Sequence, residues 1–366
     1  MLADTDHFPK TLPPGFSFVE GEPEFDAARH LALEAPSRVV SMREIGYDDE
    51  EIGQFPSPVA AAGPMRILSD EGVRALQQAI DATASRMVPS PVGDPRLYFG
   101  SYHSRFMRDL TFAPELIGFL SDVFAAPIAA HTMGCLGVQI NVGEKPEAEI
   151  LPWHEDRVSF TAVVSMYDPA RVEGGRFEYF LGTREEGKRL LADGGDLPAD
   201  RVEAPALQPG YAALIQGTAV YHRAAPLRSP GFRSSFLLSF CHRDASYPDL
   251  NDDRTYFTDQ RERLGVESDV NPVFTEWARH NAWLARARLG TLMDELPWTN
   301  DTAYIAEQLR QAIAPIEIAV ERLERGVISL EEWRNRRDSG YKDRENEVQM
   351  STPRFAPGGA EPLATL

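Results

Sequence analysis

Two residues that could bind a metal stand close together in "LPWHEDRVSF", residues 151–160. His154 and Asp156 are two positions apart, and the second half of this run looks like a strand. On an extended chain, side chains at positions i and i+2 point to the same face, so an imidazole and a carboxylate could reach one cation. Because a His-x-Asp pair also occurs by chance on solvent-facing edges, a metal site needs a third ligand.

His222, in "GTAVYHRAAPL", is the candidate for the third ligand. It ends a strand-like run, and two glycine-containing turns, in "EGGRFEYF" and "LQPGYAALIQG", separate it from Asp156. An antiparallel jelly roll can bring such distant strands together. Two imidazoles and one carboxylate on one side of a cation form the facial triad of non-haem Fe(II) sites, which leaves positions open for other ligands.

A candidate carboxylate-binding pair follows in "SPGFRSSFLLSF". Arg233 and Ser235 share one face if this run is a strand. A guanidinium donates two parallel hydrogen bonds to a carboxylate, and a hydroxyl can add a third. Arg228 is an alternative for this role, but its place in the "APLRSP" turn favours a surface position.

The order His154-x-Asp156, His222, Arg233-x-Ser235 resembles the Fe(II)/2-oxoglutarate-dependent oxygenase superfamily, over roughly residues 113 to 244. By that resemblance, the first three side chains would bind Fe(II) and would be the catalytic centre. Arg233, helped by Ser235, would pair with the distal carboxylate of the cosubstrate 2-oxoglutarate, whose 2-oxo acid end would chelate the metal. O2 would be the oxidant, succinate and CO2 the coproducts.

The sequence also departs from that superfamily. Some members carry an Asn-x-Tyr whose phenol contacts the cosubstrate, whereas Val142 and Gly143 follow Asn141 here. Gln139 and Asn141, on one strand face, are candidates for this contact, and an ordinary polar strand face is an equally good interpretation. Related halogenases replace the metal-binding acid with a small residue. Since Asp156 is intact, we expect hydroxylation of a C–H bond, with desaturation, cyclisation or demethylation as other fates of the same radical.

Candidate substrate contacts lie on both sides of the metal motif. Tyr102 and His103 precede the predicted sheet, and Arg176 and Tyr179 lie in the strand "GGRFEYF". Packing and surface charge explain the first two better than substrate binding does, and an ordinary half-buried strand explains the other two equally well.

The predicted elements give an α+β fold with a double-stranded β-helix, or jelly-roll, core flanked by N-terminal and C-terminal helices. Helices are expected in 67–87, capped by Ser69, and in 113–124, with Pro114 in the first turn. Short apolar runs bounded by Gly, Pro and Asp then predict strands, without helices between them. These runs are 135–143, 158–168, 175–181, 210–217 and 233–244.

The chain divides into four predicted segments. A proline-rich N-terminal extension covers residues 1–66, and the oxygenase core, with its leading helices, covers 67–250. A C-terminal helical region packed on the core covers 251–350, and 351–366 is expected to be a disordered tail.

Composition restricts the partners. The 366 residues include 37 basic and 56 acidic side chains, a net charge of −19, which disfavours nucleic acid and anionic membranes. With two cysteines, a thiolate metal site is not expected. The N-terminus lacks the pattern of a signal peptide, which favours a cytoplasmic protein. We expect a small-molecule substrate, and homo-oligomers through the helical regions are an open alternative.

Two other interpretations stay open at this stage. A cupin-type metal dioxygenase or isomerase would use the same ligands without 2-oxoglutarate, although Arg233 and Ser235 argue against it. A non-catalytic jelly-roll binding module would contain the triad by accident. Binding of 2-oxoglutarate separates the leading interpretation from both.

Overall fold

The fold is seen in a computed structural model, which describes residues 3, 6–88, 95–146, 150–192, 196–247 and 272–324. The helices of these ranges are α1 Ala27–His30, α2 Asp49–Ile52, α3 Asp70–Thr83, α4 Gly100–His103, α5 Arg105–Thr111, α6 Pro114–Phe124, α7 Gly134–Gly137, α8 Arg184–Ala192, α10 Pro272–Glu295 and α11 Thr302–Glu324. The strands are β1 Val39–Ser41, β2 Val59–Arg66, β3 Arg96–Leu97, β4 Ile128–Ala130, β5 Val138–Gly143, β6 Leu151–His154, β7 Phe160–Ser165, β8 Phe177–Phe180, β9 Val202–Glu203, β10 Tyr211–Gln216, β11 His222–Ala224 and β12 Arg233–His242.

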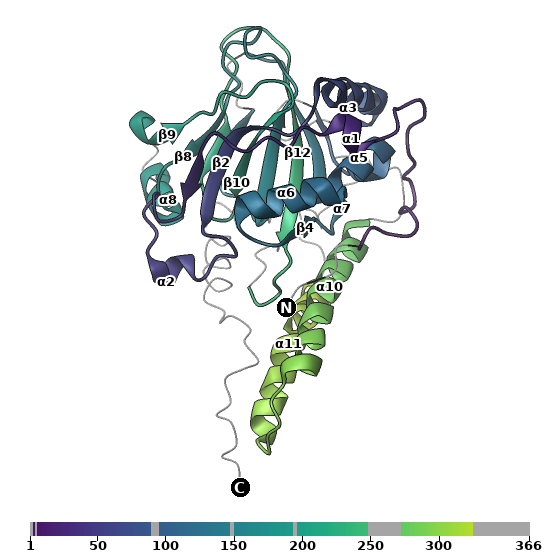
Figure 1. Cartoon of the computed structure of the whole chain (residues 1–366), viewed down its shortest axis with the longest axis vertical. Coiled ribbons are helices and arrows are strands. Elements are labelled where there is room, and N and C mark those ends of the chain that lie inside the picture. Colours follow the sequence, from purple (N-terminus) through teal and green to yellow (C-terminus); the bar gives the residue numbers. More distant parts are fainter. Residues whose placement is uncertain are drawn as a thin grey trace.

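These strands form two antiparallel sheets. The larger runs in the order β1-β2-β10-β7-β12-β5-β3, with β4 beside β12, and the smaller in the order β6-β11-β8-β9. Helices α3, α5 and α6 cover one face of the larger sheet (Figure 1). The fold is therefore a mixture of helices and antiparallel sheet, as the sequence predicted.

Alternating apolar and polar residues along β5 give the larger sheet one apolar face and one polar face. Val138, Ile140 and Val142 pack into the core beneath the helices, together with Leu116 and Phe124 of α6. Gln139 and Asn141 point to the opposite face and line a cavity. One strand thus supplies both an apolar surface for the helices and a polar wall, as its period of two requires.

The two predicted leading helices form with the expected start signals. Ser69 caps α3 and accepts a hydrogen bond from the backbone N–H of Gly72, and Pro114 occupies the first turn of α6. The sheet, however, begins before residue 67. Strand β2 pairs with β10 and β1 pairs with β2, so the end of the proline-rich stretch belongs to the sheet.

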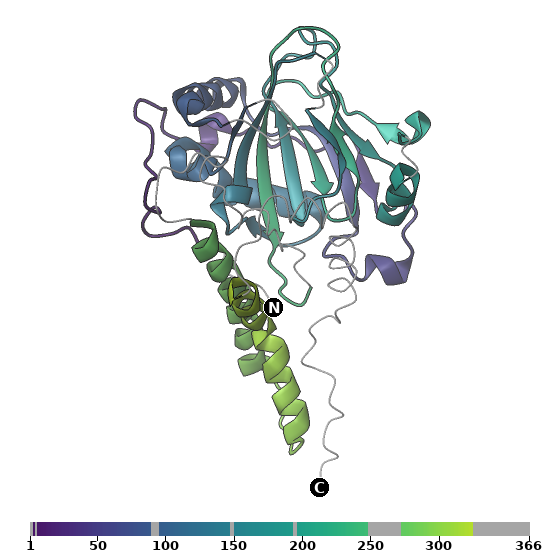
Figure 2. The same ribbon diagram turned by 180° about the vertical axis from the view of Figure 1, so that it is seen from behind.

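Helices α10 and α11 form a hairpin that extends away from the sheets (Figures 1 and 2). Its base is attached to the body through Val273 and Trp277, which pack with Phe99 and Tyr102. Residues 251–271 and 325–350 of the predicted C-terminal helical region, and the predicted tail at 351–366, lie outside the described residues. In the described ranges, no helix combines the length and the apolar character needed to cross a bilayer.

Candidate metal centre

The two histidines come from paired strands of the smaller sheet. His154 ends β6 and His222 begins β11, and the two residues are direct cross-strand partners. Residues in such pairs share one face, and the two imidazole centroids lie 4.1 Å apart. The first half of "LPWHEDRVSF" is also a strand, β6, which was not predicted: Leu151 and Ala224, and His154 and His222, are its pairs with β11. The strand predicted from residue 158 is β7, which begins at Phe160.

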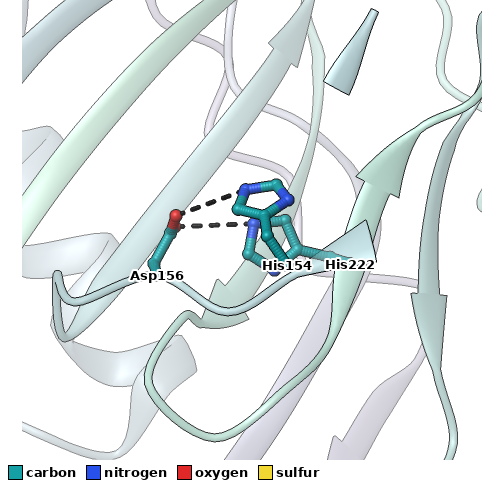
Figure 3. A group of neighbouring side chains, drawn as sticks. All are labelled: His154, Asp156 and His222. Carbon is teal, nitrogen blue, oxygen red and sulfur yellow. Dashed lines mark ion pairs between the residues drawn. The ribbon is translucent and has the colours of Figure 1, made fainter. Parts of the chain in front are cut away.

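Asp156 follows β6 in a turn that returns its carboxylate to the histidines (Figure 3). Its backbone N–H donates to the carbonyl of Gly217 at 2.9 Å. A Cβ added to Gly217 would lie 2.6 Å from Cβ of Asp156 and 2.8 Å from its Oδ2. The aspartate therefore fits only because a residue without a side chain faces it.

The triad has the donor chemistry of a metal site. Nε2 of His154 lies 3.5 Å from Oδ1 of Asp156, and Nε2 of His222 lies 3.6 Å from Oδ2. The three ligand atoms lie within 4.8 Å of one another. Each Nδ1 contacts a backbone carbonyl, that of Pro152 at 2.8 Å and that of Val220 at 3.0 Å. A carbonyl only accepts, so each Nδ1 carries the proton and each Nε2 offers a lone pair to a cation.

Burial and mutual charge set the protonation of these groups. Burial opposes the charge on Asp156, but the imidazoles of His222 and His154 lower its pKa well below the usual range. Burial and the charge of His222 lower the pKa of His154. Burial acts in the same direction on His222, yet Asp156 raises the pKa of that imidazole. An ionised carboxylate beside a neutral imidazole is the form that binds metals.

The triad opens into a cavity of about 240 Å³ between the two sheets. Its walls include Gln139, Asn141, Arg233 and Ser235, all from the inner face of the larger sheet. His154, Asp156 and His222 line it as well. All seven positions predicted to bind the metal or the cosubstrate therefore face one cavity.

Arg233 is the most unusual of these side chains, because it is a cation only 2% exposed. Its Nε donates to the carbonyl of Gly175 at 3.0 Å, while its Nη1 is buried without a hydrogen-bond partner. Burial, together with the charge of Arg96, lowers its pKa, and Tyr167 opposes this effect. A buried guanidinium with an unused donor fits an anionic ligand, because an unpaired buried charge is otherwise costly.

The candidate substrate residues lie elsewhere. Tyr102 and His103 are buried in the body beside α10 and the N-terminal segment, and neither lines the cavity. Arg176 is exposed and borders a separate outer groove. Tyr179, on β8, is the cross-strand partner of His222, but its side chain is buried in an apolar cluster and does not line the cavity. Within β8, Phe177 is the residue that lines the cavity.

Several residues of the cavity wall were not predicted from the sequence, namely Arg96, Glu155, Arg157, Thr161 and Arg223. Thr161 donates a hydrogen bond to Oδ2 of Asp156 at 2.9 Å. The position of Thr161, two residues before Val163 in an alternating strand, was the available signal. Arg96 gave no comparable signal, because the short strand β3 has no periodicity of its own.

No protein-family model and no curated protein sequence matches this chain. Among solved structures, the chain is similar to the non-haem α-ketoglutarate-dependent carbocyclase SnoK from nogalamycin biosynthesis, with 16% identity and a TM-score of 0.40 over 57% of this chain and 88% of that one. It is also similar to HygX from Streptomyces hygroscopicus with nickel and 2-oxoglutarate bound, with 14% identity and a TM-score of 0.38 over 54% and 88%. At TM-scores of this size, the function of the chain must be argued from its own site.

Proposed function

We propose that this protein is a non-haem Fe(II)- and 2-oxoglutarate-dependent oxygenase that hydroxylates a C–H bond of a small or medium-sized organic molecule. One observation carries the proposal. The His154, Asp156 and His222 triad and the buried, incompletely paired guanidinium of Arg233 face the same cavity. A 2-oxo dicarboxylic acid has the two ends that such a cavity would bind, a metal chelator and a distant carboxylate.

The fold belongs to the same proposal. The two antiparallel sheets enclose the triad between them, and we infer that they form a double-stranded β-helix. In that arrangement β6 and β11 of the smaller sheet supply the histidines, while β12 of the larger sheet supplies Arg233 and Ser235.

The residues of the chain have separable tasks in this reaction. His154, Asp156 and His222 would hold Fe(II) through three neighbouring positions and leave the others open. When bound, iron, 2-oxoglutarate and O2 supply an oxidant for the C–H bond and release succinate and CO2. Arg233 would fix the far carboxylate of the cosubstrate. Asp156 occupies the position that a halide would need, which supports hydroxylation over halogenation.

Two rival functions make different use of the same cavity. A cupin-type metal enzyme would need the triad but not a buried Arg233 with an unused donor. A non-catalytic module would need neither the bare Nε2 atoms nor the ionised carboxylate between them. The cavity therefore supports the oxygenase better than either rival.

Metal and cosubstrate binding test the proposal directly. We expect the purified protein to bind Mn(II), as an inert substitute for Fe(II), and then to bind 2-oxoglutarate with O2 excluded. His154→Ala and Asp156→Ala should lose metal binding by roughly 100-fold or more while the melting temperature of the metal-free protein changes little. With Fe(II), ascorbate and O2, the unsubstituted protein should release succinate.

The variant Arg233→Gln should retain Mn(II) and lose 2-oxoglutarate, whereas Arg228→Gln, at an exposed turn, should retain both. Binding of metal without 2-oxoglutarate would favour the cupin-type function. Binding of neither ligand would favour the non-catalytic module and would contradict the proposal.

A further inference from the structure

Arg96, which belongs neither to the triad nor to the pair of Arg233 and Ser235, also reaches this cavity. It begins β3, at the edge of the larger sheet, and lines the cavity wall. Its Nη2 donates to the backbone carbonyl of Ile150 at 3.2 Å, which directs the guanidinium across the gap toward the smaller sheet. Arg96 therefore lies where the two sheets approach each other beside β5.

Strand register places Arg96 in one row with two residues that were predicted to bind the cosubstrate, Asn141 and Ser235. Arg96 is paired with Asn141, and Asn141 is paired with Ser235. Directly paired residues point to the same face of a sheet, and all three line the cavity. Oδ1 of Asn141, at the centre of the row, is buried without a hydrogen-bond partner. The row thus presents a cation, an amide and a hydroxyl to the same space.

The charges at this end of the cavity do not balance. Arg96 lies close enough to Arg233 to lower the pKa of Arg233, so two like charges share one partly buried wall of the cavity. The acids on the wall are Glu155 and Asp156, both in the metal motif, and Glu155 pairs with Arg184 at 3.4 Å. Among the described residues, no carboxylate forms an ion pair with Arg96 or Arg233.

The charge of Arg223, another arginine of the wall, is compensated. Arg223 pairs with Glu178 at 2.7 Å and with Asp196 at 3.1 Å. The positive charges of Arg96 and Arg233, unlike that of Arg223, remain for a ligand. Bringing a carboxylate between them would remove their mutual repulsion and pair both guanidiniums.

We propose that Arg96 is a second carboxylate-binding residue, which, with Asn141 and Arg233, holds the carboxylate of 2-oxoglutarate that does not chelate the metal. This inference rests on the proposed function and extends it. Arg96 would make the pocket select dicarboxylic 2-oxo acids over monocarboxylic ones, because only the former place a charge at this end.

The test compares Arg96→Gln with the unsubstituted protein, both loaded with Mn(II) and kept without O2. We expect the dissociation constant for 2-oxoglutarate to rise roughly 10- to 100-fold, since a hydrogen bond between charged groups is removed. The dissociation constants for Mn(II) and for 2-oxobutyrate, which lacks the second carboxylate, should stay within about twofold. The metal-free variant should melt no lower than the unsubstituted protein, because removal of the Arg96 charge relieves the repulsion on Arg233.

Arg223→Gln is the matched control, because it removes another cavity arginine whose charge is already paired. It should leave 2-oxoglutarate affinity within about twofold. Should Arg96→Gln fail to fold, Arg96→Lys keeps the charge without the planar fork and must still weaken 2-oxoglutarate by about threefold or more at unchanged Mn(II) affinity.

An unchanged 2-oxoglutarate dissociation constant in a folded Arg96→Gln variant would overturn the inference. So would an equal loss of 2-oxoglutarate and 2-oxobutyrate affinity, which would indicate a structural role through the carbonyl of Ile150. If the unsubstituted protein loaded with Mn(II) bound no 2-oxoglutarate, the proposed function itself would fail, a result that the variant is not needed to see.

Discussion

The position of the Asp156 carboxylate depends on two neighbours outside the triad, Gly217 and Thr161. Gly217 gives it space and a backbone acceptor, and the hydroxyl of Thr161 donates to Oδ2. Since Oδ2 is also the atom nearest to Nε2 of His222, Thr161 fixes which oxygen faces which imidazole. Groups of this kind orient ligands that would otherwise rotate.

Thr161→Val tests that orientation with little change in shape. Removing the hydroxyl should weaken Mn(II) binding roughly tenfold or more, in the range seen when a ligand loses its hydrogen-bond partner. Thr161→Ser keeps the hydroxyl and should bind Mn(II) within about threefold of the unsubstituted protein. Titration of the metal-free protein with Mn(II) measures both. Equal affinities in the valine and serine variants would show that Oδ2 needs no donor.

Residues near one another in the sequence were predictable from their spacing, and His222 from its place at the end of a strand-like run, whereas other contacts made through register or a turn were not predicted. His154 and Asp156 are two positions apart, and Arg233 and Ser235 repeat that spacing, so local periodicity indicated both pairs. Arg96 joins Asn141 only through the pairing of β3 with β5, and Gly217 meets Asp156 only through a turn. No local pattern predicts such contacts. For the same reason, the sequence did not show that the four candidate substrate residues would lie outside the cavity wall.

At the scale of elements, two helices that cover the larger sheet, α3 and α6, each contain a glycine, and the two glycines have different surroundings. Gly72, in the first turn of α3, lies against the chain at His30, and an added Cβ would lie 2.1 Å from that carbonyl oxygen. Gly118, within α6, would place a Cβ in open space. The two glycines stand in similar helices and serve different purposes.

Alanine at these two positions should therefore act in opposite directions. Gly118→Ala should raise the free energy of unfolding by about 0.5 to 1 kcal/mol, because alanine favours a helix more than glycine does. Gly72→Ala should lower it by about 1 to 3 kcal/mol, because the backbone must move to admit the methyl group. Urea unfolding compares the two. Stabilisation by both substitutions would show that α3 is free to shift away from His30.

Helices and long strands were predicted more fully than short strands. Ser69 and Pro114 mark the starts of α3 and α6, and five apolar runs mark β5, β7, β8, β10 and β12. Strand β6 was not predicted, because Pro152 is an unusual residue within a strand. Proline is tolerated there since β6 is the edge of the smaller sheet. Position in a sheet, and not residue type, decides such cases.

At the scale of the whole molecule, a buried polar contact joins the hairpin to the body. Glu276 of α10 is 3% exposed, and its Oε1 accepts from the backbone N–H of Gly134 at 3.0 Å. Tyr102 and Cys135 also face this carboxyl. The sequence predicted a C-terminal helical region, but periodicity alone did not show that an acid would lie inside its contact with the core.

This acid makes the stability of the molecule depend on pH. Burial raises the pKa of Glu276 to about 7, despite the hydrogen bonds from Tyr102, Gly134 and Cys135 that lower it. An exposed glutamate in the unfolded chain titrates near 4.3. Between these values the folded protein holds a proton that the unfolded chain has released. The contribution of Glu276 therefore favours folding below about pH 4, and it is lost as the pH rises to 7.

Glu276→Gln isolates this contribution, because His7 and His103, whose pKa values burial lowers to about 4, act in the opposite sense and remain in both proteins. Near pH 4.5 the two proteins should unfold with similar free energies. By pH 7.5 the glutamine variant should be the more stable by about 3 kcal/mol, the equivalent of the pKa difference. Urea unfolding at several pH values, followed by tryptophan fluorescence, measures the difference. Parallel profiles would mean that Glu276 is already ionised within the contact, and that the hairpin is attached to the body by a charge.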